Sequence, residues 1–294
     1  MLISLTHETS FEYTQPVVES AVELRLAPPS DEHQTVRSHA LDIQPRAKLF
    51  WHPDYFHNTV HFFTVSTRHD KLTVVNRALV DTSRANLRFA GSGEPDLDPG
   101  PVPTFDYVQF GGPVVRHPEL AVIAARFRND GDLYGRLKAL TAFLRDRIEY
   151  KPLVTRVDSS LDDVLALGQG VCQDFAHLMI GVCRELGLPS RYVSGYICTG
   201  SANQVRGSGA THAWCECYLP DRGWVGFDPT NNLLVDDRYV LVARGRDYRD
   251  VPPTRGIYRG SAQESITVTV RTDCIDGPGA VSYTHLRAHE TGRN

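Results

Sequence analysis

A cysteine stands at the start of a helical pattern in GQGVCQDFAHLMIGVCRELGLP, which runs from Gly168 to Pro189. A thiolate attacks carbonyl carbons far better than a thiol does, so a catalytic cysteine needs surroundings that stabilise the thiolate. The free N–H groups and the dipole at a helix N-terminus provide them. Gly168 and Gly170 would let a substrate approach the backbone, and the N–H of Cys172 could face an oxyanion. Cys172 is therefore the candidate nucleophile.

The alternative for Cys172 is a small buried hydrophobe, which describes most free cysteines. Two downstream motifs favour the catalytic interpretation. His212 in THAW begins a strand pattern after a Gly/Ser-rich loop, and its ring could accept the thiol proton. Asp228 in FDPTNN ends the partner strand and could accept the other imidazole N–H. Each of these residues alone is more often structural, but the three in these local settings predict a Cys-His-Asp triad.

The hairpin between the two motifs makes the triad testable by geometry. If residues 220–223 formed a regular four-residue loop, Asp228 would face away from His212. An odd loop length, or a bulge in the second strand, would bring Asp228 opposite Trp214 and onto the face of His212. Because Gly226 is a plausible bulge position, we predict a register shift there.

Other polar residues have weaker claims. Gln169 could donate its side-chain amide to the oxyanion, with a solvent-facing loop residue as the alternative. His177 is expected to be packed or exposed rather than a ligand, and Trp214 could line the cleft or pack in the core. His285 and His289 lie one helical turn apart, but no glutamate lies between them and no third ligand is in view. Since no calcium-loop pattern is present either, we expect no metal and no cofactor.

The cysteines are expected to be free thiols. The sequence has six, all in its second half: Cys172, Cys183, Cys198, Cys215, Cys217 and Cys274. Disulfide frameworks are typical of small secreted chains, whereas this chain is long and its start, MLISLTHETSF, has no export signal. The CEC pair at 215–217 has no second pair with which to form a metal site. These features favour a cytoplasmic protein.

Composition excludes several classes of protein. With 41% hydrophobic and 22% charged residues, the chain is globular rather than disordered. A net charge of -4 with interspersed signs provides no basic stripe, so we expect no nucleic-acid partner. No window reaches the roughly 18 consecutive apolar residues of a membrane helix, so no membrane partner is expected.

The elements that must position the candidate residues change type along the chain. Residues 1–90 alternate with period two and are rich in β-branched and aromatic residues, which predicts an antiparallel sandwich or sheet. A Gly/Pro/Asp-rich linker follows over 91–118. Helical spacing then begins, and 119–250 is expected to form a second domain. The segment 251–275 contains a last strand pattern that could return to the first domain. The segment 276–294 has no core face, and we expect a non-native or disordered tail.

Three helices are predicted in the second domain. The first places five apolar residues at helical spacing: Leu133, Leu137, Leu140, Leu144 and Ile148. The second begins with a capping-box-like spacing of Ser160 and Asp163. The third follows Cys172 as an amphipathic helix with one apolar face, formed by Phe175, Leu178, Met179, Val182 and Leu186.

Three segments together closely resemble the bacterial transglutaminase-like cysteine protease family: SFEYTQPVVESAVELRLAPP, GQGVCQDFAHLMIGVCRELGLPSRYVSGY and THAWCECYLPDRGWVGFDPTNN. The resemblance covers most of the chain up to about Thr272. It implies an α+β fold in which a papain-like, transglutaminase-type core at 119–250 follows a β-rich N-terminal domain. The family's catalytic residues fall on Cys172, His212 and Asp228. A departure at Asp54–Asn58, DYFHN in place of a shorter turn, puts only a loop in doubt.

The expected function follows from this chemistry and resemblance. A cysteine-dependent hydrolase of peptide or isopeptide bonds, acting on a peptide or protein substrate through a thioester, is the leading hypothesis. Acyl transfer to a primary amine uses the same triad and stays open. A third hypothesis is a non-enzymatic binding module that kept the fold, against which the intact triad argues.

Overall fold

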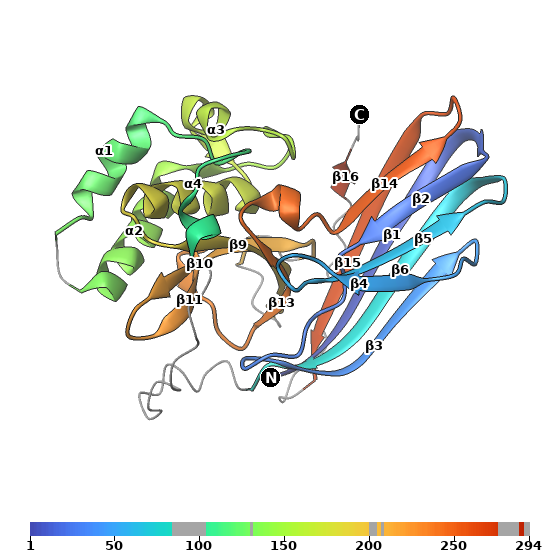
Figure 1. The fold of residues 1–294 in the computed structure, drawn as a ribbon, viewed down its shortest axis with the longest axis horizontal. Helices are drawn as coiled ribbons and strands as arrows, with labels where there is room; N and C mark the ends of the chain where they lie inside the picture. The colour runs from blue at the N-terminus through green and yellow to red at the C-terminus, as the bar shows by residue number, and fades with distance from the viewer. Residues whose placement is uncertain (84–103, 130–131, 200–204, 207–208, 276–287, 291–294) are drawn as a thin grey trace.

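The computed structural model describes residues 1–83, 104–129, 132–199, 205–206, 209–275 and 288–290. Two lobes lie side by side, a β-sandwich and a lobe of helices packed on a sheet (Figure 1). Strands from both ends of the chain build the sandwich, and the middle of the chain builds the second lobe. The predicted α+β class, with an antiparallel β-domain first, is confirmed.

The sandwich consists of two antiparallel sheets, of order β16-β15-β1-β6-β3 and β14-β2-β5-β4. Their strands are β1 (Leu2–Val17), β2 (Glu19–Leu24), β3 (Thr35–Gln44), β4 (Phe50–Pro53), β5 (Thr59–Val65), β6 (His69–Asp81), β14 (Thr254–Arg259), β15 (Glu264–Cys274) and β16 (Ala288–Glu290). Alternate residues of β1 and β6 are buried, as the period-two pattern requires. The apolar contact between the sheets includes Phe11, Leu24, Phe63 and Leu72.

The second lobe is built on an antiparallel sheet of order β12-β11-β10-β9-β13. Its strands are β9 (Ser190–Ile197), β10 (His212–Leu219), β11 (Gly223–Asp228), β12 (Leu233–Leu234) and β13 (Tyr239–Gly245). The helices are α1 (Pro118–Arg126), α2 (Leu133–Arg147), α3 (Leu161–Leu167) and α4 (Cys172–Glu185), with the short strand pair β7 (Glu149–Tyr150) and β8 (Gln169–Gly170). The predicted capping box of Ser160 and Asp163 begins α3.

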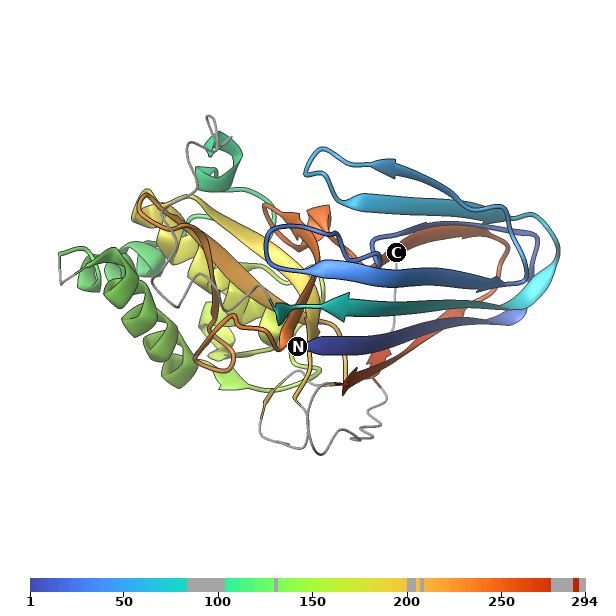
Figure 2. The same ribbon diagram turned by 90° about the horizontal axis from the view of Figure 1, so that it is seen from below.

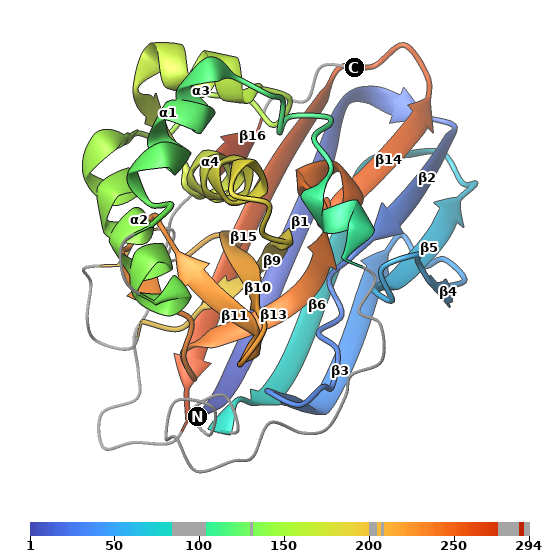
Figure 3. The same ribbon diagram turned by 60° about the vertical axis from the view of Figure 1, so that its left-hand side comes forward.

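Helix α4 is the centre of this lobe and is buried well beyond the single apolar face that its sequence predicts. It lies between the other helices and the strands β9 and β10 (Figure 3), and every residue from Gln173 to Arg184 is buried. Its polar side chains find partners inside the protein. His177 accepts a hydrogen bond from the Tyr248 backbone N–H at 3.1 Å, and Arg184 donates to four backbone carbonyls. Burial lowers the pKa of His177 to about 3, so this histidine is packed and neutral.

The two lobes share one hydrophobic core. Ile3, Leu5 and Val270 of the sandwich join the apolar cluster of α4, β9 and β10, and Figure 2 shows the sandwich strands extending away from this junction. The side-chain amides of Gln34 and Asn58 also bind the edge strand β13. Gln34 bonds both the N–H and the C=O of Leu241, at 2.9 and 2.8 Å, and Asn58 does the same with Arg244, at 2.8 and 2.7 Å.

These two amides satisfy backbone groups that an edge strand otherwise leaves open. Asn58 closes the Asp54–Asn58 loop, whose backbone N–H groups at Phe56 and Asn58 donate to the Asp54 carboxylate. The loop that departs from the family pattern is thus a contact between the lobes.

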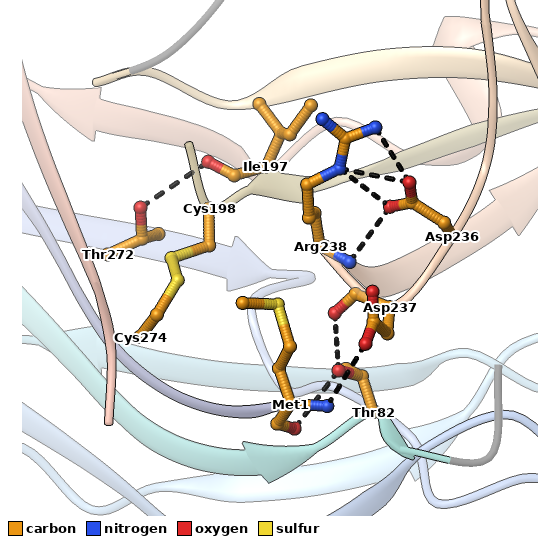
Figure 4. Close-up of a disulfide and its surroundings, with 9 residues drawn as sticks. All are labelled: Met1, Thr82, Ile197, Cys198, Asp236, Asp237, Arg238, Thr272 and Cys274. Carbon is orange, nitrogen blue, oxygen red and sulfur yellow. Dashed lines mark hydrogen bonds and ion pairs between the residues drawn. A yellow bond between two sulfur atoms is a disulfide. The ribbon is translucent and has the colours of Figure 1, made fainter. Parts of the chain in front are cut away.

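Cys198 and Cys274 form a disulfide (Figure 4), so the prediction of six free thiols is wrong. Cys198 follows β9 and Cys274 ends β15, 76 residues later. Composition could not indicate their proximity, because it depends on β15 pairing with β1 and on the sandwich packing against β9. Disulfides persist in oxidising compartments, so cysteine usage no longer supports a cytoplasmic location, which stays a prediction.

The segments flanking the two domains are only partly described. Within the predicted linker, Tyr107 is buried and contacts Trp224 edge-on, with ring centroids 5.2 Å apart. The strands β14 and β15 pair with β2 and β1, which places the segment before the tail in the sandwich. In the tail, residues 288–290 pair with β15, and His285 lies outside the described residues. None of the helices in the described ranges has the length and apolarity needed to cross a bilayer.

Candidate active site

Cys172 is the first residue of α4, and the loop before it is held by a buried carboxylate. The Val171 backbone N–H donates to Asp174 Oδ2 at 2.8 Å, and the Thr155 hydroxyl donates to the same oxygen at 2.6 Å. Burial raises the pKa of Asp174. A Cβ at Gly170 would lie 2.7 Å from Asp174 Oδ2, so this glycine is needed for the close packing of the loop. Together these contacts fix the start of the helix and hence the thiol.

The hairpin register settles where Asp228 lies. Leu219 pairs with Gly223, so the loop between β10 and β11 has three residues, the odd length that the triad requires. Continuing the pairs Glu216↔Gly226 and Cys215↔Phe227 by one step brings Asp228 opposite Trp214, on the face of His212. The predicted bulge at Gly226 is wrong, because pairing there is regular.

Gly226 has a packing role instead. A Cβ at this position would lie 2.6 Å from the side chain of Val235, whose backbone N–H donates to the Gly226 carbonyl at 3.0 Å. The glycine lets the chain that follows β12 pass close over β11.

Asp228 is completely buried and accepts hydrogen bonds from five of the described groups. His212 Nε2, the Asn231 side-chain amide and the Tyr239 hydroxyl contact Oδ2 at 2.7, 2.8 and 2.8 Å. The backbone N–H groups of Thr230 and Asn231 contact Oδ1 at 3.0 and 3.2 Å. Burial alone would raise the pKa of Asp228, but the charge of His212 and these hydrogen bonds outweigh burial and lower it. The carboxylate is therefore ionised and fixed in orientation.

The imidazole of His212 lies between this carboxylate and the thiol of Cys172. Burial lowers the pKa of His212, but the Asp228 carboxylate outweighs that effect, and with a contribution from the neighbouring Cys172 thiol the pKa rises to about 10. Within the described residues, Nδ1 of this ring is buried and has no hydrogen-bond partner, whereas Nε2 is held by Asp228. Nδ1 is thus the nitrogen free to exchange a proton with Cys172.

Aromatic rings support the histidine from the core. Trp214 is 1% exposed, so it packs in the core rather than lining a cleft, and its ring lies 6.2 Å from the His212 ring and 5.3 Å from that of Tyr239. A Cβ at Gly195 would lie 2.6 Å from the Trp214 ring and 2.2 Å from the Val240 carbonyl. Gly195 on β9 therefore leaves room for the indole beneath the histidine.

The amide of Gln169 is engaged elsewhere. Its Nε2 donates to the carboxylate of Glu149 at 2.7 Å, across the β7·β8 pair. This contact occupies one of its two N–H groups, and the oxyanion role of Gln169 stays a prediction. Among the residues that the structure describes, no group of three His, Cys, Asp or Glu side chains is arranged to hold a metal ion.

Sequence reasoning missed the residues that hold the triad in place. Asn231 and Tyr239 bind Asp228, and Asp174 fixes the loop before Cys172. A signal for Asn231 was present, because an aspartate whose carboxylate accepts from backbone N–H groups two and three residues later is a recurrent turn, and DPTN has its composition. The sequence carried no such signal for Tyr239, which comes from a different strand.

Comparison with known proteins assigns the chain to a family. A family model of the transglutaminase-like superfamily matches residues 121–229, and one of the bacterial transglutaminase-like N-terminal region matches residues 3–81. Uncharacterized protein ML0607 of Mycobacterium leprae is 32% identical over 273 residues, which are 90% of this chain and 96% of the relative. The chain belongs to the transglutaminase-like superfamily.

Two further proteins extend the comparison. The crystal structure of a "Putative Cysteine Protease from Cytophaga hutchinsonii" has the same fold, with a TM-score of 0.73, 20% identity and coverage of 98% of this chain and 93% of that one. The Protein-glutamine gamma-glutamyltransferase of Pseudomonas aeruginosa is 28% identical over 133 residues, 40% of this chain and 19% of that protein. The superfamily indicates an enzyme, and the choice of acyl acceptor is left to chemical argument.

Proposed function

We propose that this protein is a cysteine-dependent hydrolase of peptide or isopeptide bonds, with Cys172 as nucleophile, His212 as acid and base, and Asp228 as the residue that positions the imidazole. One observation carries the proposal: a buried His212–Asp228 pair, joined at 2.7 Å, presents its single unpaired nitrogen beside a thiol at a helix N-terminus. Most buried side-chain nitrogens in proteins have a hydrogen-bond partner, so an unpaired ring nitrogen next to a thiol favours a catalytic histidine over a structural one.

In the acylation half, His212 Nδ1 takes the thiol proton, and the Cys172 sulfur attacks the amide carbonyl carbon. The C=O electron pair moves onto oxygen, where the N–H groups at the start of α4 can stabilise the oxyanion. As the carbonyl re-forms, the C–N bond breaks and Nδ1–H protonates the leaving amine. A thioester on Cys172 remains.

In the deacylation half, water gives a proton to His212 Nδ1 and its oxygen attacks the thioester carbonyl. The C–S bond breaks, the acid departs, and the proton returns to sulfur. Asp228 stays ionised throughout, because five hydrogen bonds stabilise its carboxylate. The negative charge of this carboxylate in turn stabilises the imidazolium form of His212.

Acyl transfer is the second candidate function. A primary amine in place of water would give an amide rather than an acid, without any change in the triad. The name of the Pseudomonas aeruginosa relative supports this candidate for the part of the chain that the two share. The two functions differ only in the acceptor, so a partition experiment separates them.

The first test of the proposal is the alkylation rate of each cysteine, measured by peptide mapping in the wild type, His212→Ala and Asp228→Asn. We expect Cys172 to react at least a hundredfold faster than Cys183, which is fully buried and serves as the internal control. The rate at Cys172 should fall in both variants. Equal rates at Cys172 and Cys183, or a rate at Cys172 that ignores His212, would exclude the catalytic role.

The second test identifies the acceptor. The enzyme is loaded with an activated acyl ester, and intact-mass spectrometry follows the thioester in water with and without a primary amine. Loss of the acyl mass as free acid at all amine concentrations supports hydrolysis. Conversion mainly to the amide at millimolar amine would establish acyl transfer instead. Cys172→Ala should form no acyl-enzyme in either case.

A further inference from the structure

Arg206 is tied to the candidate triad through one side chain. Its backbone N–H donates to Asn231 Oδ1 at 2.8 Å, and its carbonyl accepts from Asn231 Nδ2 at 3.1 Å. The same Nδ2 donates to Asp228 Oδ2 at 2.8 Å. Arg206 is thus held one residue away from the carboxylate that orients His212.

The guanidinium of Arg206 lies over an aromatic ring and lacks an acid. Its Cζ is 5.4 Å from the centre of the Tyr150 ring, and its Nη1 is buried without a hydrogen-bond partner among the described residues. No carboxylate in the described part of the chain forms an ion pair with it. The acids next to its two contacts, Asn231 and Tyr150, are engaged elsewhere: Asp228 pairs with His212, and Glu149 accepts from Gln169.

Tyr150 places this cation beside the nucleophile. Its strand β7 pairs with β8 at Gly170, two residues before Cys172, and the Lys151 N–H donates to the Gly170 carbonyl at 2.9 Å. Burial raises the pKa of the Tyr150 phenol to about 12, and the nearby charges of Cys172, Arg206 and Asp228 also act on it. The phenol therefore lies within electrostatic range of both the thiol and the guanidinium.

A second arginine adds to the positive charge. Burial lowers the pKa of Arg206, and the neighbouring positive charge of Arg145 on α2 lowers it further. A buried guanidinium N–H without an acceptor costs free energy, and a like charge nearby adds to that cost. A carboxylate bound to Arg206 would offset both, since guanidinium and carboxylate form charge-assisted hydrogen bonds of matching geometry.

We propose that Arg206 is a specificity-determining residue that binds a carboxylate of the acyl donor. The preferred substrate then carries a negative charge next to the scissile amide. The substrate class rests on the proposed function, but the anion site itself does not, because it concerns only the charge beside Cys172.

The first experiment needs no turnover. Iodoacetate and iodoacetamide are similar in size, but only iodoacetate is charged. The alkylation rate of Cys172 by iodoacetate divided by its rate with iodoacetamide therefore reports the local electrostatic potential. In Arg206→Gln we expect this ratio to fall roughly fivefold, because one positive charge that attracts the iodoacetate anion is lost. Arg145→Gln should lower the ratio by a smaller factor. An unchanged ratio in Arg206→Gln would overturn the proposal.

Arg222→Gln is the matched control. This arginine also lies over a tyrosine ring, with Cζ 4.8 Å from the centre of Tyr134, but it belongs to the loop at the opposite end of β10 from His212. Its replacement should leave the ratio unchanged. A similar fall in Arg222→Gln would show a general charge effect and contradict a local site.

The second experiment names the substrate. Two fluorogenic peptide pools are compared, one with Asp and Glu beside the scissile amide and one with Asn and Gln. Further arms carry a free α-carboxylate or its amide at the same place. We expect wild-type kcat/KM to favour one carboxylate arm at least tenfold, with Arg206→Gln losing that preference through KM and Arg206→Lys keeping part of it.

The outcomes separate the two proposals. If Cys172 reacts no faster than Cys183, the proposed function is refuted. The iodoacetate-to-iodoacetamide rate ratio at Cys172 would still test the anion site. Turnover without a preference for either carboxylate, in an enzyme whose rate ratio ignores Arg206, would refute only the inference about Arg206.

Discussion

Two buried acid–base clusters lie on the same face of β10, and they are built differently. At its start, His212 bonds Asp228; four residues later, Glu216 bonds Arg191 at 2.6 Å and approaches Arg244 at 3.3 Å. His212, Asp228 and Glu216 are buried, and the side chains of Arg191 and Arg244 are 14% and 19% exposed. In each cluster one buried nitrogen has no hydrogen-bond partner among the described residues, Arg244 Nε and His212 Nδ1. Arg244 Nε still faces the Glu216 carboxylate at 3.3 Å as an ion pair, whereas the acid of the other cluster, Asp228, binds the opposite nitrogen of His212.

The Glu216 cluster joins the two lobes. Arg244 also pairs with Asp31 of the sandwich at 2.7 Å, and the Arg191 guanidinium lies 4.0 Å from the centre of the Trp224 ring. Burial raises the pKa of Glu216, but the two arginines outweigh burial and bring it down to about 2. With its charges matched in this way, the cluster has a structural role.

The difference lies in what the unpaired nitrogen faces, a carboxylate at Arg244 and a thiol at His212. A buried polar atom without a partner costs stability, so its presence at His212 Nδ1 calls for a reason. The neighbouring thiol provides one, because a ring nitrogen bound to another group could not take its proton. The comparison therefore predicts that variants of the His212 cluster lose activity, and that variants of the Glu216 cluster lose stability.

The largest effect is expected for Asp228→Asn. An amide keeps the shape but can donate a hydrogen bond to His212 Nε2, which would leave the ring proton on the wrong nitrogen. We expect kcat/KM to fall about 10³–10⁴-fold, measured with the best peptide pool, as for loss of the orienting acid in other triads. Glu216→Gln is the matched variant and should retain activity within about tenfold wherever it is folded. Equal losses of activity in both would refute the comparison.

The next effect concerns Glu216→Gln. Removing Glu216 leaves the charge of Arg191 uncompensated, while Arg244 keeps its ion pair with Asp31. Breaking one member of a buried ion pair in this way costs about 3–5 kcal/mol. Urea unfolding of the intact chain should show this loss. Replacing Glu216 and Arg191 together by Gln and Met should recover part of the loss. A cost under about 1 kcal/mol would mean that water screens the cluster.

The two clusters should also limit stability at opposite ends of the pH range. Glu216 has a lowered pKa when folded, so its contribution is present above about 4.5 and is lost as the pH falls toward 2. His212 has a raised pKa, so its contribution is complete below about 6.5 and is lost as the pH rises through about 10. Unfolding free energies measured from pH 3 to 10.5 should show both declines.

Each variant should remove one decline. Glu216→Gln is expected to flatten the acid side, and Asp228→Asn the alkaline side, because each removes the charge that shifts the pKa. Loss of the alkaline decline in Glu216→Gln would show that the two clusters are not independent.

Sequence reasoning could predict what depends on local pattern. The position of Cys172 at a helix start follows from the glycines and the apolar spacing after it. The need for Asp228 to face His212 limited the hairpin to an odd loop or a bulge. The Gly226 bulge was the wrong choice between two ways of shifting register, since strand period alone does not distinguish a shorter loop from an extra residue.

What could not be predicted depends on long-range packing. Helix α4 is buried on all sides because helices and strands distant in sequence pack around it. The spacing of its apolar residues indicated burial of one face only. The Cys198–Cys274 disulfide and the amide contacts of Gln34 and Asn58 with β13 join residues 76 to 207 positions apart. No periodicity links such positions, and composition argued against the disulfide.

The smallest effect, and the sharpest test of the comparison, is expected for Tyr239→Phe. This change removes one of five hydrogen bonds to Asp228 and nothing that touches the thiol. Loss of one hydrogen bond to a charged group costs about 1.5–3 kcal/mol at most. The four remaining donors still stabilise the Asp228 carboxylate, so the effect on activity should be small. We expect kcat to fall about fivefold. The pH above which activity declines should rise slightly, because a less stabilised carboxylate attracts the imidazolium proton of His212 more strongly. Kinetics from pH 6 to 10.5 would measure both effects. If the alkaline decline in activity moved to lower pH instead, the Tyr239 hydroxyl would act by positioning His212 and not by stabilising the negative charge of Asp228.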